Sequence, residues 1–235
     1  MKEIFRCVVG STLYGLNGPG SDVDVKSVAL PSAEDLLGMA DTARGHWEQS
    51  EPSDTVVYSL TKFYALLAKG NPTVLELIAQ IPSDCVLHED PLWASVRDFA
   101  RKHFITKAIL PAFFGYTKDQ FVRVREHKAQ NNRTEMIAKH GYDLKCSSHV
   151  YRLAVQAVEW MTLGMASPRM TGKDREVALD MKQGKYTYEQ TIEILEIALR
   201  GMKAAESTCK LPEAPDMAAV NDFVTQIHRS VIVAG

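Results

Sequence analysis

Two aspartates, Asp22 and Asp24, are two positions apart in the segment SDVDVKSVAL, whose valines predict a strand over residues 23–30. Side chains alternate along a strand, so both carboxylates are expected on the same face, about 7 Å apart. Two close carboxylates repel each other, and a divalent cation such as Mg²⁺ relieves that repulsion. The pair therefore indicates a metal site. The other interpretation is the polar outer face of an edge strand.

A glycine and a serine, Gly10 and Ser11, follow a predicted strand over residues 3–9 and begin a short predicted helix, TLYG. The start of a helix offers unpaired backbone N–H groups, and glycine lets a phosphate come close to them. This position suits a phosphate site. Taken alone it is equally typical of an ordinary helix cap, because serine commonly fills that role.

Together, Gly10-Ser11, Gly15 and Ser21-Asp22-Val23-Asp24 follow the pattern GS, three residues, G, five residues, SDxD. In this respect the sequence resembles the DNA polymerase β-like nucleotidyltransferases. The resemblance implies that Gly10, Ser11 and Ser21 bind an NTP such as ATP, and that the two aspartates bind two Mg²⁺ ions, with Mn²⁺ as an alternative. The implied reaction transfers a nucleoside monophosphate to an acceptor and releases pyrophosphate.

A wider resemblance covers most of residues 8–165. It is to a branch of predicted nucleotidyltransferases associated with RNA ligases in bacteria and their viruses, which implies RNA repair with an RNA end or a tRNA as acceptor. One departure is Ser27, where the branch usually has glycine, and a strand can hold a serine there. The matching stretches are PSAEDLLGM, YSLTKFYALLAKGNPTVLELI, FFGYTKDQFVRV and GYDLKCSSHVYRLAVQAVEWMTLG.

The resemblance also implies a third carboxylate on a neighbouring strand. Asp54 is favoured because it begins the predicted strand TVVYSL, although SEPSD is also a turn-rich sequence in which an aspartate is ordinary. It would complete the metal site and polarise the acceptor hydroxyl. Glu51 and Glu76 are the alternatives. Glu76 falls in an apolar helix and therefore needs a partner, so we expect it to orient a basic residue or a loop.

Lys145, His149 and Arg152 are spaced i, i+4 and i+7 on a predicted helix over residues 142–164, so they share one face. Lysine and arginine suit a triphosphate, and a histidine can give a proton to departing pyrophosphate. We predict that these three bind substrate. The alternatives are a solvated helix face, or a His149 that is satisfied in the core. A second, less regular basic set is expected to guide a nucleic-acid backbone: Arg123, Arg125, Lys128 and Arg133.

Charge is distributed unevenly along the 235 residues, although the net charge is −2. Residues 1–60 hold nine acidic and four basic residues, whereas residues 101–152 hold eleven basic and four acidic ones. This pattern suits a metal-bearing part and an anion-binding part. No apolar run approaches the ~20 residues of a membrane span. The amino terminus does not resemble a secretory signal, and the four cysteines form no CxxC pair. We therefore expect a cytoplasmic protein with reduced thiols and no membrane association.

The periodicities predict an α+β protein. A small mixed β-sheet of the polymerase β-like palm type, with helices, is expected over residues 1–85, and a helical domain that contributes basic substrate-binding residues over 86–235. The leading hypothesis is a Mg²⁺-dependent nucleotidyltransferase. A binding module without turnover and a nucleotide hydrolase are the competing hypotheses, and the oligomeric state stays open. Helices are predicted at 61–70, 72–81, 91–104, 111–128, 142–164, 173–183, 187–208 and 214–232.

Overall fold

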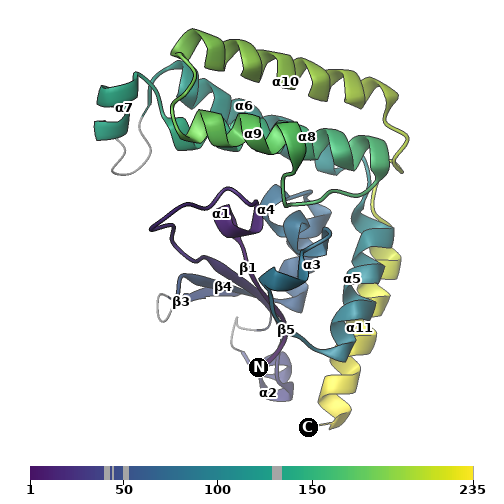
Figure 1. The fold of residues 1–235 in the computed structure, drawn as a ribbon. Helices are drawn as coiled ribbons and strands as arrows, with labels where there is room; N and C mark the ends of the chain where they lie inside the picture. The colour runs from purple at the N-terminus through teal and green to yellow at the C-terminus, as the bar shows by residue number, and fades with distance from the viewer. Residues whose placement is uncertain (40–42, 44, 50–52, 129–133, 235) are drawn as a thin grey trace. The chain divides into compact units, whose positions relative to one another are not determined.

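The computed structural model describes residues 1–39, 43, 45–49, 53–128 and 134–234. It divides into two compact units: the first comprises residues 1–109 and 212–235, and the second comprises residues 110–211 (Figure 1). The first unit thus contains elements from both ends of the chain. The domain limits expected from the sequence, 1–85 and 86–235, remain a prediction, and the compact units follow other limits.

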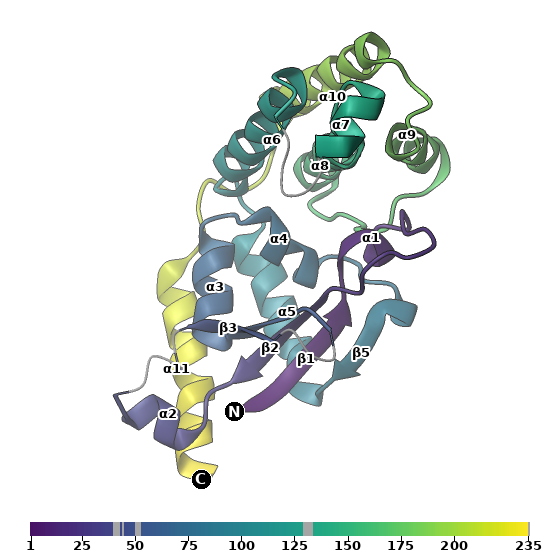
Figure 2. The same ribbon diagram turned by 90° about the vertical axis from the view of Figure 1, so that its left-hand side faces the viewer.

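The first unit contains a five-stranded mixed sheet, which Figure 2 shows, and its strand order is β3-β4-β2-β1-β5. Strands β2 and β4 are parallel, and the other neighbouring pairs are antiparallel. The three strands predicted from the sequence are confirmed, but the second begins two residues later than expected. The short outer strands β3 and β5 were not predicted, because four residues carry almost no periodic signal. The strands are β1 Lys2–Val8, β2 Val25–Leu30, β3 His46–Gln49, β4 Thr55–Ser59 and β5 Val86–Glu89.

The helices of the first unit pack on this sheet. Phe5 of β1 stacks on Trp93 of α5 with ring centroids 4.3 Å apart, and Phe63 of α3 packs on the same indole. The predicted helix over 72–81 is shorter than expected and passes into the 3₁₀ turn η2. The helices are α1 Gly10–Leu13, α2 Ala33–Leu37, α3 Leu60–Ala68, α4 Pro72–Leu75, α5 Pro91–Phe104 and α11 Met217–Ala234, with 3₁₀ turns η2 Glu76–Ile78 and η3 Ser83–Cys85.

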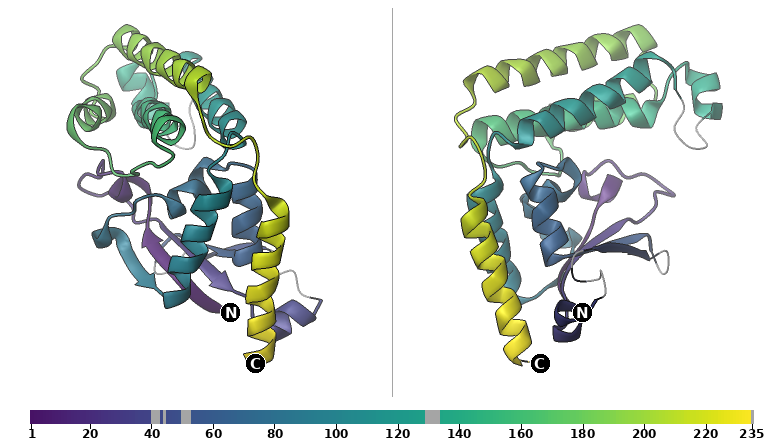
Figure 3. Two further views of the ribbon diagram at one scale, coloured as in Figure 1. Left: turned by 90° about the vertical axis from the view of Figure 1, so that its right-hand side faces the viewer. Right: turned by 180° about the vertical axis from the view of Figure 1, so that it is seen from behind.

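Helix α11 brings the end of the chain back to the first unit, where it runs beside α5 (Figure 3). Phe223 of α11 stacks on Phe99 of α5, with ring centroids 4.0 Å apart and planes within 3° of parallel. Tyr64 of α3 lies beside both rings. This aromatic contact ties a segment more than 100 residues distant in sequence to the helices under the sheet.

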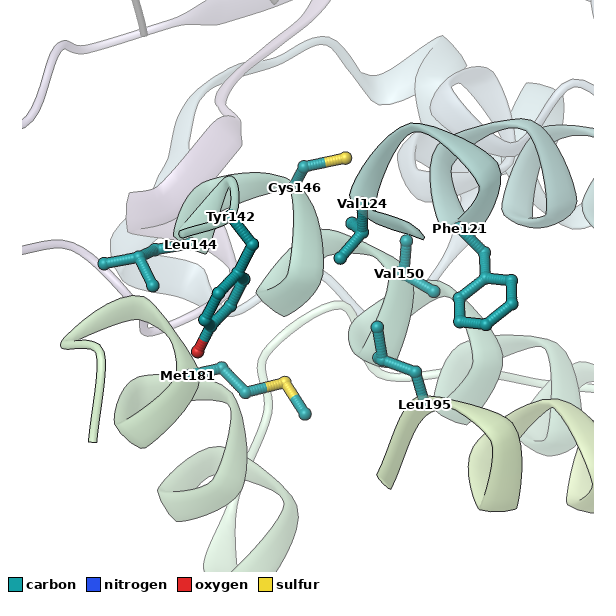
Figure 4. Packing of buried hydrophobic residues seen from close by; sticks show 8 residues of the cluster. All are labelled: Phe121, Val124, Tyr142, Leu144, Cys146, Val150, Met181 and Leu195. Atoms are coloured by element: carbon teal, nitrogen blue, oxygen red, sulfur yellow. The ribbon is translucent and has the colours of Figure 1, made fainter. Parts of the chain in front are cut away.

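The second unit consists of helices. Its long central helix, α8, packs against α9 and α10, and a cluster of buried apolar side chains lies between the helices (Figure 4). The predicted loop over 131–134 lies outside the described residues except for Thr134, which begins α7. The helices are α6 Ile109–Arg125, α7 Thr134–His140, α8 Leu144–Leu163, α9 Gly172–Lys182 and α10 Tyr188–Thr208.

The predicted fold class is confirmed: an α+β protein with a small mixed sheet and a separate helical region. Across the residues that the structure describes, none of the helices combines the length and the apolar character needed to cross a membrane.

Candidate functional site

The aspartate pair lies just before strand β2 rather than inside it, because β2 begins at Val25. Asp24 still belongs to the sheet ladder, since its carbonyl accepts a hydrogen bond of 2.8 Å from the Val9 N–H. Its side chain is partly buried, whereas Asp22 is exposed. The alternation of side chains therefore applies to Asp24 and the residues that follow it, and Asp22 is positioned by the preceding turn.

That turn is closed by Ser21. Its backbone N–H donates to the Gly18 carbonyl (3.1 Å), and its hydroxyl oxygen accepts from the Gly18 N–H (2.9 Å). Ser21 thus stabilises the turn that precedes Asp22 and Asp24. The contact with substrate that the sequence predicted for Ser21 stays a prediction.

Gly10 and Asp24 approach each other closely. Gly10 begins α1 with a φ of +65°, a left-handed conformation that favours glycine. A Cβ built on it would lie within 3.0 Å of Asp24 Oδ2, which is closer than real Cβ atoms come to another heavy atom. The carboxylate is therefore packed against the backbone of the Gly10-Ser11 turn. A phosphate bound at that turn would lie beside Asp24.

Asp54 lies next to Asp24 across the parallel pair of β2 and β4. Val25 pairs with Thr55, so the two aspartates precede paired residues on neighbouring strands. The Val25 N–H donates to the Asp54 carbonyl at 2.8 Å, and strands spaced by about 4.8 Å bring the two backbones close. Asp54 is exposed at this edge of the sheet. Its backbone therefore has the adjacency that a third carboxylate requires.

The two alternatives for the third carboxylate have different outcomes. Glu51 lies outside the described residues. Glu76 is buried in η2, where Oε1 accepts a hydrogen bond of 2.8 Å from the Tyr14 hydroxyl and Oε2 lies 3.8 Å from Lys26 Nζ. Glu76 thus has the partner that a buried carboxylate needs, and the basic residue near it is Lys26.

The donor groups around Asp24 suit a hard cation. Asp22, Asp24 and Asp54 offer only oxygen, and Mg²⁺ is commonly held by one or two carboxylates together with substrate phosphates. Among the described residues, no three His, Cys, Asp or Glu side chains are already gathered as a metal-binding group. A cation that takes some of its ligands from a bound triphosphate fits this arrangement.

The predicted basic stripe occupies α8 in the second unit, and its three residues have different surroundings. Lys145 is exposed near the start of the helix, His149 is partly buried, and Arg152 is only 2% exposed. Arg152 Nη1 donates to Gln156 Oε1 at 2.6 Å, and Nη2 lies 3.1 Å from His149 Nδ1.

The contact with Arg152 favours one tautomer of His149. A guanidinium only donates hydrogen bonds, so His149 Nδ1 accepts from Arg152, and the ring proton is on Nε2. Nε2 lies 3.1 Å from the Tyr116 hydroxyl and donates to it. This arrangement favours the tautomer in which Nε2 carries the proton and donates to Tyr116.

A further basic residue, Lys182, lies near Lys145, and the spacing of residues in the sequence did not predict it. Lys182 of α9 is partly buried, and desolvation lowers its pKa, followed in effect by the nearby ammonium of Lys145. Two neighbouring ammonium groups favour an anion between them. Lys145 and Lys182 are 37 positions apart and become neighbours only because α8 packs on α9.

The second unit also has a pocket of about 540 Å³ between α8, α9 and α10. Its walls are mainly apolar, and Glu159 and Asp174 supply carboxyl groups. Desolvation raises the pKa of Glu159, and Asp174 adds to the effect. The three predicted basic residues do not line this pocket, so it is distinct from the predicted substrate-binding stripe.

Comparison with known proteins identifies the family. Residues 1–226 match RlaP, the RNA repair pathway DNA polymerase beta family, and the chain belongs to this family. It is also similar to an uncharacterized 38.9 kDa protein from the nrdC-mobD intergenic region of Enterobacteria phage T4. That similarity is 28% identity over 131 residues, covering 51% of this chain and 38% of the phage protein.

A solved structure, the nucleotidyltransferase-like protein of Exiguobacterium sibiricum, aligns with 88% of this chain and 69% of its own, at 11% identity and a TM-score of 0.33. The family match confirms the resemblance seen in the sequence. The chain is a polymerase β-like member of an RNA repair family.

Proposed function

We propose that this protein is a Mg²⁺-dependent nucleotidyltransferase that moves a nucleoside monophosphate from an NTP to an acceptor hydroxyl, with release of pyrophosphate. The observation that carries the proposal is the packing of the Asp24 carboxylate against Gly10, the glycine of the GS motif. It brings the candidate metal ligand and the candidate phosphate site into contact. Asp54 adds a second carboxylate on the neighbouring strand.

In this proposal Gly10 and Ser11 bind the triphosphate through the backbone and the serine hydroxyl. Helix α1 has only four residues, so its dipole is small, and the close approach that glycine allows is the more important feature. Asp22, Asp24 and Asp54 would hold two Mg²⁺ ions, or Mn²⁺ in their place. When bound, such ions neutralise the charge of the triphosphate and of the departing pyrophosphate.

The transfer forms one bond and breaks one. The acceptor oxygen attacks the α-phosphorus, the bond from that phosphorus to the bridging β-phosphate oxygen breaks, and pyrophosphate leaves with the electron pair. Asp54, which is exposed at this edge of the sheet, polarises the acceptor hydroxyl and accepts its proton. Lys145, His149 and Arg152 are proposed to bind the substrate, with Lys145 as the exposed charge and Arg152 acting through His149.

The proposed acceptor is an RNA end or a tRNA, which is consistent with the RNA repair family to which the chain belongs. Arg123 and Arg125, at the end of α6, are the described members of the basic set that could follow an RNA backbone, together with Lys128. Lys128 forms an ion pair with Glu126.

The test is a transfer assay with each α-labelled NTP, Mg²⁺ and a panel of RNA, tRNA, protein and small-molecule acceptors. Label on an acceptor identifies the base and the acceptor class together. Label released only as free nucleoside monophosphate would indicate a hydrolase, and nucleotide binding without turnover would indicate a binding module. Either result would overturn the proposal.

We predict that Asp24→Asn abolishes the transfer and leaves the thermal unfolding transition within a few degrees of wild type. The reason is that the amide is a neutral, weaker ligand for a divalent cation at the same position and of the same size. Asp98→Asn, at a side chain 67% exposed on α5, is the matched control and should retain full activity. Transfer by the Asp24 variant at the wild-type rate would contradict the assignment.

A further inference from the structure

A buried ion pair adjoins the candidate metal site. Lys26 of β2 and Glu76 of η2 lie 3.8 Å apart, with side chains 13% and 5% exposed. Lys26 Nζ also donates to the Thr73 carbonyl at 2.6 Å. Ammonium and carboxylate groups so far from water are retained only as a pair, because either alone would carry a large desolvation cost.

Lys26 belongs to the same face of the sheet as Asp24. It follows Asp24 by two positions in the ladder, so alternation directs both side chains to one side, with backbones about 7 Å apart. Cys7 pairs with Lys26 across β1 and β2, and both Lys26 and Glu76 influence the pKa of its thiol, which burial raises to about 12. This face therefore has an ammonium group two positions along the strand from a candidate ligand for a divalent cation.

Glu76 is held in place from the other side of the site. The Tyr14 hydroxyl, at the end of α1, donates to Glu76 Oε1 at 2.8 Å. One buried carboxylate thus contacts both the helix that begins with the Gly10-Ser11 turn and the strand that follows Asp24.

We propose that Glu76 is a positioning residue for the metal site: it neutralises Lys26, so that the ammonium does not repel a divalent cation at Asp24. This inference rests on the proposed function, because it requires a cation there. Without Glu76, the positive charge of Lys26 on the same face of the sheet weakens cation binding. Removal of both charges together should restore cation binding, since the ammonium that repels the cation and the carboxylate that neutralises it are then both absent.

The test is a titration with Mn²⁺ alone, without nucleotide. Electron paramagnetic resonance measures the concentration of free Mn²⁺ at each step. We expect Glu76→Gln to raise the dissociation constant roughly tenfold, which corresponds to one uncompensated charge near a divalent ion in a partly screened environment. The double variant Lys26→Met with Glu76→Gln should return to within about twofold of wild type. Glu89→Gln, a carboxylate of β5 paired with Arg97, is the matched control and should bind as wild type does.

Asp24→Asn separates the two proposals. If it binds Mn²⁺ as wild type does, the metal assignment of the proposed function is wrong. If it loses binding while Glu76→Gln binds like wild type, only the inference about Glu76 is overturned.

Two further results bear on Glu76 alone. A double variant as weak as Glu76→Gln would show that packing, not charge, is responsible, and would overturn the inference. If Glu76→Gln does not fold, Lys26→Met provides the test: its affinity should equal or exceed that of wild type, and weaker binding would overturn the inference.

Discussion

At the scale of single residues, the candidate site depends on a contact between a glycine backbone and a carboxylate. Gly10 combines a left-handed φ with a close approach to Asp24, so two separate physical requirements select the smallest residue there. Ser27 illustrates the opposite case, since a side chain replaces the glycine that the related branch usually has. Its hydroxyl is fully buried and lies 2.8 Å from the Phe5 carbonyl, so β2 holds the serine with its polar atom satisfied.

We predict that Gly10→Ala both destabilises the protein and displaces the Asp24 carboxylate. The left-handed φ alone costs about 1 kcal/mol for alanine, and the contact with Asp24 adds to that cost. Gly20→Ala is the matched control, because Gly20 has a φ of +76° but no atom within 4 Å of an added Cβ. The difference in unfolding free energy between the two variants, from urea titration, measures the contact. Equal unfolding free energies for the two variants would show that the Asp24 side chain moves away from the added Cβ at no energetic cost.

At the scale of elements, one face of α8 contains both an exposed charge and a charge buried in the helix packing. The spacing of Lys145, His149 and Arg152 predicts one face, yet the first is exposed and the last is buried in the second unit. Arg152 bridges His149 and Gln156 inside the helix packing, and it thereby sets the tautomer of His149. Arg152 thus acts within the protein, and the exposed positive charge of the stripe is that of Lys145.

Arg152→Lys is expected to lower the unfolding free energy by about 1–3 kcal/mol, because a single ammonium cannot span both partners and leaves a buried group unsatisfied. Arg200→Lys on α10, at a side chain 68% exposed, is the control and should change stability by less than about 0.5 kcal/mol. Nitrogen-15 shifts of His149 should also move away from the Nε2–H tautomer in the Arg152 variant. Unchanged shifts would show that other groups fix this ring.

At the scale of the whole molecule, the chain leaves the first unit after residue 109 and returns to it at residue 212. The helical unit is therefore an insertion between α5 and α11, and α11 completes the helical layer under the sheet. The Lys107 N–H donates to the Pro212 carbonyl at 2.7 Å where the two passages meet. Helix α11 is therefore part of the packing of the sheet unit, through Phe223.

Phe223→Ala is expected to lower the stability of the first unit by about 2 kcal/mol, because it removes a partly buried ring that stacks on Phe99. Hydrogen exchange followed by mass spectrometry should show faster exchange in β1, α3 and α5, with exchange in α8 and α10 unchanged. Met217→Ala, at the half-exposed start of α11, is the control and should leave both units as in wild type. Faster exchange throughout the chain would show that the two units unfold together.

The sequence alone determined the elements that depend on local patterns. Strands β1, β2 and β4 and most helices follow from periodicity and capping, as with Ser32, whose side chain caps α2 in a capping box. The GS and SDxD residues and the family also follow from the sequence, because their order and spacing are chain properties. Short strands β3 and β5 and helix α7 escaped prediction, since four to seven residues give little periodic signal.

Only the tertiary structure decided which distant residues meet. It set Asp54 beside Asp24 through parallel pairing, paired Glu76 with Lys26, brought Lys182 to Lys145, and buried Arg152 while leaving Lys145 exposed. None of these follows from spacing, because strand pairing and helix packing join segments that are separated by 30 or more residues in the first three cases. Burial likewise depends on what the rest of the chain places over a helix face. The local sequence therefore determines the chemistry of the aspartates, and the fold determines their electrostatic environment.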